Sequence, residues 1–251
     1  MYTASEKVLM PRLFLILLIV TVVLWLLLRH RSEAAQSIPF IVITLALIVG
    51  EVIKQVKCFQ RGYIYWDIPL HFCSTYFIWF SLAEFTRGKV RATMQNIAVI
   101  STLYAALGMY IAPHGIFAEA SDNMFADYFA AHTIIFHHLV VLYLMLSIAF
   151  HRFHPKKSDA WVWTACFSVY FVTALCCAYT LDTNYFNILD SEIIPPLETF
   201  RLQVGQVWYD AFLGFVVIGL GSIALRICAR VCKSLEKDEG ELELLEVTEE
   251  E

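Results

Sequence analysis

Charged residues are scarce in this chain. Of its 251 residues, 16% are charged and 59% are hydrophobic, whereas soluble domains carry roughly 25% charged and 45–50% apolar residues. The net charge of -5 gives no sign of a nucleic-acid-binding surface, so no nucleic-acid partner is expected. No polar linker separates the hydrophobic blocks. The composition therefore indicates one domain embedded in a membrane.

Metal and disulfide motifs are also missing. The chain has seven cysteines, and no two of them have the CxxC spacing. Neither a zinc ribbon nor a disulfide framework is therefore indicated. There is no HExxH motif, and we expect no metal and no other cofactor. The last hydrophobic segment contains no lysine, which excludes a retinal Schiff base there.

Seven segments are long and apolar enough to cross a membrane as helices, which takes about 20 residues. They cover residues 12–29, 38–56, 64–85, 94–112, 128–150, 160–180 and 206–229. The first could be a signal peptide, but Arg29 and Arg31 follow it where a cleavage site would need small residues, so we interpret it as a retained span. The predicted fold is an all-α, polytopic transmembrane helix bundle with about seven spans.

Lysine and arginine predict the orientation. With the N-terminus outside, twelve of the 18 lie on the inner side and six on the outer side, as the positive-inside rule requires. The segment 54–61 disagrees, because it puts three of these cations on the outer side. Residues 1–230 are expected to form the transmembrane domain, and residues 231–251 an acidic, disordered cytoplasmic tail.

Ionisable side chains inside the predicted spans are the candidates for a functional site. Such a group costs at least about 2.5–3.5 kcal/mol at the bilayer centre, so it usually faces the bundle interior. The third and fifth predicted spans carry most of them: Asp67, His71 and Cys73, then His132, His137 and His138. Alternatively, Asp67 starts a helix at the interface, and Cys73 only fills space in the core. Glu84 is expected to reach the far interface. We expect Cys73 and His71 to share a polar pocket with at least one of the three histidines.

Three short motifs suggest a family. The stretch Asp67–Ser74 resembles the PLHxC signature of the bacterial YwaF family of membrane proteins. That family is related to the eukaryotic transmembrane protein 164 family of cysteine-dependent phospholipid acyltransferases. His132 with Phe136-His137 is similar to the family's histidine-bearing helix. Asp182–Tyr185, followed by two prolines at 195 and 196, is similar to its TNY segment. The order and spacing agree over residues 35–230.

The resemblance implies a reaction and a location. Cys73 would attack a phospholipid acyl ester to form a thioester, and a lysophospholipid hydroxyl would then take the acyl group. The expected partners are therefore phospholipids and lysophospholipids, and the expected location is the bacterial cell membrane. The catalytic candidates are Cys73, His137 and His71; because His71 lies about 200° around a helix from Cys73, His137 is the better candidate for the base. The remaining candidates for binding or orienting the substrate are Asp67, His132, His138, Thr183, Asn184 and Tyr185.

Two other interpretations remain open. A transporter or proton relay would use an intramembrane chain of titratable groups, formed by Glu51, Asp67, His71, His132 and His137. Such a relay would not need Cys73. Metal or haem ligation by His71, Cys73 and the histidines of the fifth span is a third idea, without a recognisable spacing. The sequence does not define an oligomeric state.

Overall fold

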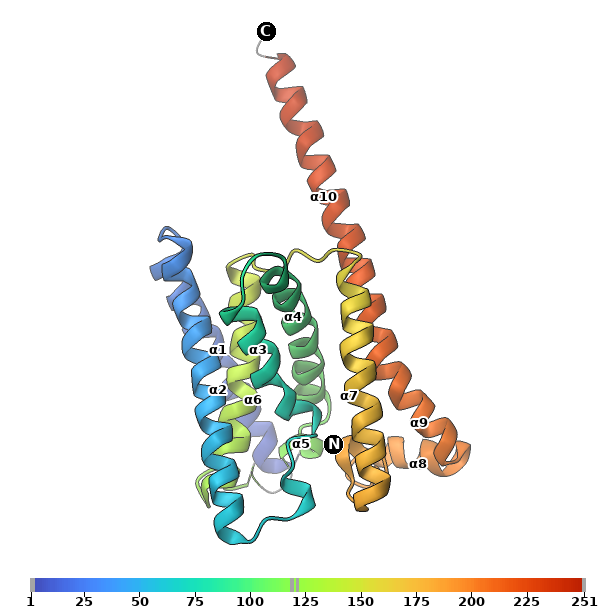
Figure 1. The fold of residues 1–251 in the computed structure, drawn as a ribbon. Coiled ribbons are helices and arrows are strands. Elements are labelled where there is room, and N and C mark those ends of the chain that lie inside the picture. Colours follow the sequence, from blue (N-terminus) through green and yellow to red (C-terminus); the bar gives the residue numbers. More distant parts are fainter. Residues whose placement is uncertain (1–2, 118–119, 121, 250–251) are drawn as a thin grey trace.

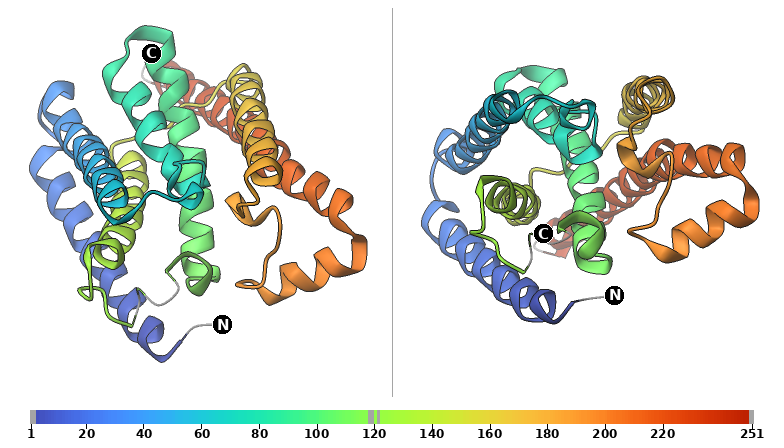
Figure 2. Two further views of the ribbon diagram at one scale, coloured as in Figure 1. Left: turned by 60° about the horizontal axis from the view of Figure 1, so that its bottom comes forward. Right: turned by 90° about the horizontal axis from the view of Figure 1, so that it is seen from below.

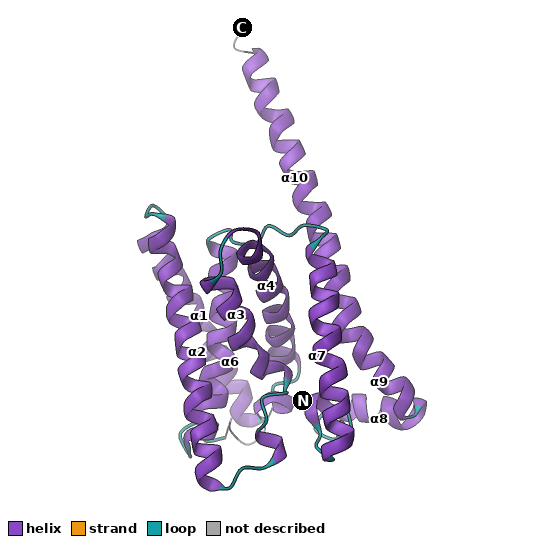
Figure 3. Ribbon diagram, viewed as in Figure 1, coloured by secondary structure: helices purple, strands orange, loops and turns teal. Residues whose placement is uncertain are grey.

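The structure, a computed structural model, describes residues 3–117, 120 and 122–249. Within these residues every regular element is helical (Figure 3). Six helical segments are long and apolar enough to cross a membrane: α1 (Ala4–Leu28), α2 (Glu33–Arg61), α4 (Gly88–Ile111), α6 (Tyr128–Ala149), α7 (Asp159–Leu181) and Gln206–Leu235, which joins α9 (Gln206–Gly214) to α10 (Gly221–Glu249). The shorter helices are α3 (Tyr76–Phe85), α5 (His114–Phe117) and α8 (Pro195–Val204). The prediction of an all-α, multi-pass membrane protein is confirmed.

The third crossing of the bundle differs from the others. In Figure 1, α2 descends to the lower end, α3 rises to the upper end and α4 descends again. The ten residues of α3 span about 15 Å, roughly half of the hydrocarbon core of a bilayer. Residues 62–75, with two short 3-10 turns, complete the crossing. The continuous span predicted over 64–85 is therefore wrong in its first half, where Pro69 lacks the N–H that a helix needs.

Helix α6 lies at the centre of the N-terminal part of the bundle. Seen from below, α1, α2 and α4 surround it (Figure 2). Tyr143 of α6 stacks on Phe80 of α3, with ring centroids 3.8 Å apart. His137 and His138 are both buried, so the histidine-rich helix faces protein rather than lipid.

A buried ion pair fixes the upper end of α3. The Glu84 carboxylate accepts hydrogen bonds from Arg152 at 2.8 Å and from the Tyr143 hydroxyl at 2.7 Å. Arg91 lies 3.7 Å from the same carboxylate. Glu84 therefore does not reach the interface as predicted, because these partners compensate its charge inside the bundle.

Helices α7 and α10 pack against each other, and both contact α4 (Figure 1). A π-helical turn, Phe215–Leu220, interrupts the last span. The indole N–H of Trp163 donates to the carbonyl oxygens of Val217 and Ile218, each at 3.1 Å. Gly221 follows this turn, and a Cβ at that position would lie 2.1 Å from the Trp163 ring. The close approach of α10 to α7 thus requires a glycine here.

The two ends of the bundle differ in charge. Figure 1 places the connections at 29–32, 86–87 and 150–158 at the upper end, and the N-terminus at the lower end. These connections carry six of the twelve lysines and arginines that the sequence assigns to the inner side. Helix α10 continues beyond the upper end to Glu249. The orientation itself, and disorder of residues 231–251, stay predictions.

Candidate functional site

The segment that replaces a helix in the third crossing begins at a glycine. Gly62 ends α2 with a φ of 92°, a backbone conformation that glycine adopts without steric cost. Ile68 is extended, with φ -61° and ψ 130°, as expected for a residue that precedes a proline. Irregular backbone at membrane depth is tolerated only where it is buried in protein or lines a cavity. Residues 62–75 should therefore mark the site.

Asp67 ties this segment to α2. Its carboxylate pairs with Arg61 at 2.5 Å and accepts the N–H of Ile64 at 3.2 Å. Its carbonyl oxygen accepts a hydrogen bond from Gln55 at 3.0 Å. Asp67 is only 4% exposed, so in this structure it links the segment to its neighbours and is not a solvated residue at the interface.

Two tyrosines donate hydrogen bonds to backbone carbonyls of this segment. The hydroxyl of Tyr170 in α7 donates to the carbonyl of Leu70 at 2.9 Å. The hydroxyl of Tyr185, in the connection after α7, donates to the carbonyl of Tyr65. Because unpaired backbone groups are costly in a membrane, these bonds stabilise the irregular segment.

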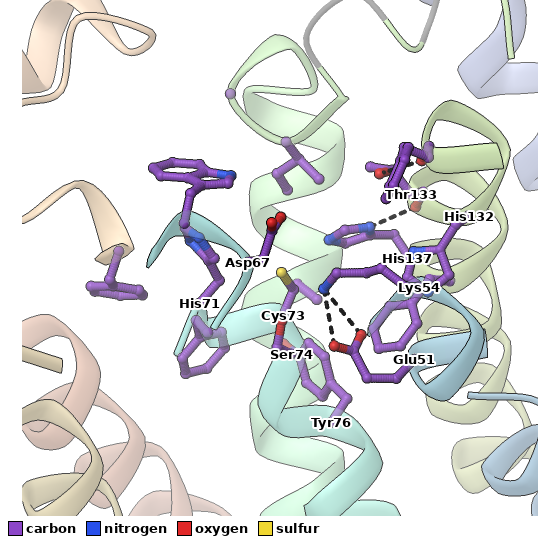
Figure 4. Close-up of a pocket in the computed structure, with 18 of the residues that line it drawn as sticks. Glu51, Lys54, Asp67, His71, Cys73, Ser74, Tyr76, His132, Thr133 and His137 are labelled. Atoms are coloured by element: carbon purple, nitrogen blue, oxygen red, sulfur yellow. Dashed lines mark hydrogen bonds and ion pairs between the residues drawn. The ribbon is translucent and has the colours of Figure 1, made fainter. Parts of the chain in front are cut away.

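The segment lines a cavity of about 640 Å³ between the helices. Figure 4 shows polar side chains gathered around Cys73. They come from α2, residues 62–75, α6 and the connection after α7: Glu51, Lys54, Arg61, Asp67, His71, Cys73, Ser74, His132, Thr133, His137 and Asn184. Aromatic and aliphatic side chains form most of the remaining wall. Such a lining suits a ligand with apolar chains and a polar centre.

Cys73 occupies the first turn of the helical run that leads into α3. It lies in the 3-10 turn Phe72–Thr75, directly before Tyr76, and its sulfur points into the cavity (Figure 4). Helix N-termini favour the thiolate form of a cysteine. The position of Cys73 is thus suited to a nucleophile.

The structure separates the three histidines of α6. His132 and His137 line the cavity, whereas His138 does not. His138 instead stacks on Phe117 of α5, with ring centroids 5.8 Å apart. Nδ1 of His137 lies 2.7 Å from the carbonyl oxygen of Thr133. Since a carbonyl only accepts, a neutral His137 carries its proton on Nδ1 and a lone pair on Nε2.

His71 lies on the opposite side of the cavity from α6 (Figure 4). Its ring packs between Trp66 and Tyr185, at centroid distances of 4.3 and 5.5 Å. Its Nε2 atom is buried without a hydrogen-bond partner. Within the described part of the chain, no three His, Cys, Asp or Glu side chains lie close enough together to hold a metal ion. Nothing in the cavity therefore supports the metal interpretation.

The TNY segment contributes mainly to the shape of the site. Asn184 lines the cavity, but its amide donates to the carbonyl of Asp190 at 3.0 Å and closes its own loop. Thr183 is not among the lining residues, and its hydroxyl bonds to a carbonyl two residues earlier. Tyr185 is buried and holds the 62–75 segment. The catalytic and orienting roles expected for all these residues stay predictions.

An ion pair on α8 stabilises the far side of this loop. Glu198 accepts the N–H of Ser191 at 2.8 Å and a hydrogen bond from Arg201 at 2.9 Å. The bond to Arg201 lowers the pKa of Glu198 to about 2. The pair therefore stays charged at any pH near neutrality.

Lys54 was not expected in the cavity, and Glu51 was expected only as part of a proton relay. Lys54 was counted only as an outer-side charge, yet its side chain is 20% exposed and lies in the cavity (Figure 4). The signal was helical spacing, because Glu51, Lys54, Cys58 and Arg61 recur at intervals of three or four residues. Such residues share one face of a helix, and all four line the cavity. Two of the cations that disagreed with the charge rule thus belong to the site.

Comparison with known proteins agrees with the sequence motifs. The TMEM164 family matches residues 1–225, which include every residue that lines the cavity. No curated protein and no solved structure matches the chain. Because the match covers most of the 251 residues, this multi-pass membrane protein belongs to the TMEM164 family.

Proposed function

We propose that the protein is a membrane acyltransferase that uses Cys73 as nucleophile and His137 as general base. The observation that carries this proposal is the cavity, because Cys73 and His137 both line it together with apolar side chains. A thiol needs a base to form its reactive thiolate. A cavity between membrane helices also gives access to substrates that are dissolved in the bilayer. Its proposed substrates are phospholipids and lysophospholipids; the bacterial source expected from the YwaF resemblance stays a prediction.

The reaction has two balanced steps. First, Nε2 of His137 takes the thiol proton, and the Cys73 sulfur attacks the ester carbonyl of a phospholipid. The carbon–oxygen bond of the ester breaks, the acyl group remains on sulfur as a thioester, and the leaving alkoxide receives the proton from His137. Second, the hydroxyl of a lysophospholipid gives its proton to His137 and attacks the thioester. The acyl group moves to that oxygen, and the released thiolate is reprotonated.

One observation favours a different function. The Nε2 atoms of His71 and His132 are buried without hydrogen-bond partners, and Glu51 and Lys54 lie in the same cavity. A chain of titratable groups could relay protons across part of the membrane. This alternative does not require the sulfur of Cys73, so the two functions respond differently to its removal.

Transfer of a labelled acyl group distinguishes them. Purified protein in lipid vesicles receives a phospholipid with an isotopically labelled acyl chain and an unlabelled lysophospholipid, and mass spectrometry follows the label. Wild type should transfer it and Cys73→Ala should not. Cys166→Ala is the matched control, because Cys166 is a partly buried cysteine of α7 outside the cavity. Equal transfer by wild type and Cys73→Ala would refute the acyltransferase proposal. Proton flux that survives in Cys73→Ala but not in His71→Ala would favour the relay.

A further inference from the structure

Lys54 is the least expected residue in the cavity. It lies in α2, seven residues before the end of the helix, in a span that is otherwise largely apolar. A lysine inside a membrane protein is costly, so it is usually retained for a function and has a partner. Cys58 and Arg61 follow it on the same face, but Arg61 is nearly half exposed and pairs with Asp67. Of these two cations, Lys54 is thus the more deeply buried.

Glu51 fixes the position of the Lys54 ammonium group. The two carboxylate oxygens lie 3.0 and 3.1 Å from Nζ. Gln55 donates a further hydrogen bond to Glu51 at 2.8 Å, so the carboxylate is itself held in place. The glutamate is buried, and its charge needs Lys54 as a partner. The Lys54 side chain therefore points in one direction, toward Cys73 (Figure 4).

The charge of Lys54 acts on both reacting groups. Lys54, Cys73 and His137 line the same cavity, and the Lys54 ammonium group points toward the sulfur of Cys73 (Figure 4). A positive charge at this place favours a thiolate over a thiol, and it opposes a second positive charge on the imidazole. The first effect favours the nucleophile, whereas the second keeps the free His137 imidazole neutral, as a base must be, and weakens it as a proton acceptor.

We propose that Lys54, held by Glu51, is a positioning residue that stabilises negative charge on the sulfur of Cys73. This inference rests on the proposed function, because it assigns Lys54 to the reaction of the same thiol. Lys54 itself forms no bond with the acyl group. Its removal should therefore slow formation of the thiolate without removing the nucleophile.

Several other titratable groups face Cys73 and must be kept constant in a test. They are Glu51 and Arg61 on α2, Asp67 and His71 on residues 62–75, Tyr76 on α3, His132 and His137 on α6, and Tyr170 on α7. None of them is changed in the variants below. A difference between variants then reports the charge at position 54.

The test is the rate at which iodoacetamide alkylates Cys73 as a function of pH. The full chain is reconstituted in vesicles, and mass spectrometry quantifies the modified Cys73 peptide. Lys54→Met keeps the length of the side chain and removes the charge, so its pH–rate profile should move to higher pH and its rate at pH 7 should fall by about tenfold, the equivalent of one pH unit. Lys54→Arg keeps the charge and should stay within about threefold of wild type.

Lys57→Met is the matched control. Lys57 is a lysine on the same helix that lies over the Tyr128 ring and does not line the cavity, so its profile should coincide with wild type. If Lys54→Met does not fold, Lys54→Gln provides the uncharged variant. A folded, uncharged variant whose profile coincides with wild type would overturn the inference, and so would an equal shift in Lys57→Met. Because alkylation needs no lipid substrate, a shift without acyl transfer would support the role of Lys54 and refute the acyltransferase.

Discussion

His137 and His138 are neighbours that make the same hydrogen bond, yet only His137 lines the cavity. Each has Nδ1 2.7 Å from the carbonyl oxygen four residues earlier in α6. The Nε2 atom of His138 is buried without a partner beside Phe117. The two residues therefore share a tautomer and a helix, and they differ in access to Cys73.

That difference makes His138 a control for His137. We expect His137→Ala to reduce acyl transfer by roughly 10²–10⁴-fold, the usual contribution of a general base. The loss of acyl transfer in His138→Ala should be at least tenfold smaller than in His137→Ala, because the His138 imidazole does not reach the cavity. Initial rates of label transfer at fixed protein concentration measure both. If the larger loss belongs to His138→Ala, His137 is not the base.

Replacing the sulfur of Cys73 by oxygen should also abolish transfer. A hydroxyl is much harder to deprotonate than a thiol, so Cys73→Ser keeps the shape of the side chain and loses the nucleophile. An acyl-phosphonate lipid probe should label wild type at Cys73, and should leave Cys73→Ser unlabelled. Labelling at another cysteine in both proteins would assign the nucleophile elsewhere.

Glu84→Gln should destabilise the fold. The change removes one charge from a buried pair and leaves Arg152 uncompensated, which typically costs about 3–5 kcal/mol. Unfolding in detergent with a chemical denaturant measures the loss. Glu192 is exposed, and Glu192→Gln should change the stability by less than about 0.5 kcal/mol. Equal stabilities of the two variants would show that Glu84 needs no partner.

Two glycines should respond in opposite ways to alanine. At Gly221 a Cβ would lie 2.1 Å from Trp163, so Gly221→Ala forces α10 away from α7 and should cost about 1–3 kcal/mol or more. At Gly50 the nearest atoms, in the His132 ring, are 3.5 Å away. Gly50→Ala should therefore be tolerated, and higher helix propensity can stabilise it by about 0.5–1 kcal/mol. The same unfolding assay measures the stability of both variants. A Gly221→Ala variant more stable than wild type would contradict the packing of α7 on α10.

Labelling of single cysteines tests the orientation. In a chain whose native cysteines are blocked, Asn123→Cys probes the lower end and Ser158→Cys the upper end. A membrane-impermeant maleimide should label Asn123→Cys in intact cells and Ser158→Cys only after lysis. The reverse pattern would place the N-terminus inside.

The long apolar runs made most of the fold predictable. Six predicted spans correspond to helical segments in the structure, because about 20 apolar residues suffice to define a membrane helix. The irregular backbone in the first half of the third span was not predictable in this way. Residues 64–75 are mostly apolar, like the residues of a membrane helix, although they include Pro69. Hydropathy depends only on composition, whereas this segment also makes hydrogen bonds with Tyr170 and Tyr185, which are distant in the sequence.

The site was predictable as a group of residues, not as an arrangement. Histidines and a cysteine stand out in an apolar chain, and the structure places His71, Cys73, His132 and His137 around one cavity. The sequence could not separate His137 from His138, because their difference depends on how α6 is rotated. Lys54 was not predicted as a site residue for another reason: a lysine near the end of a span is normally an interfacial charge.

The irregular backbone of the third crossing also constrains biogenesis. The carbonyl of Leu70 finds its hydrogen-bond donor on Tyr170, 100 residues later in the chain. While the ribosome is still making α6, this carbonyl lacks its native partner, and the segment is poorly suited to rest in lipid. Residues 62–75 therefore lack this hydrogen bond until α7 has been made. In nascent chains truncated before α7 the cavity around Cys73 is also incomplete, because Asn184 and Ile193, which line it, follow α7 in the chain.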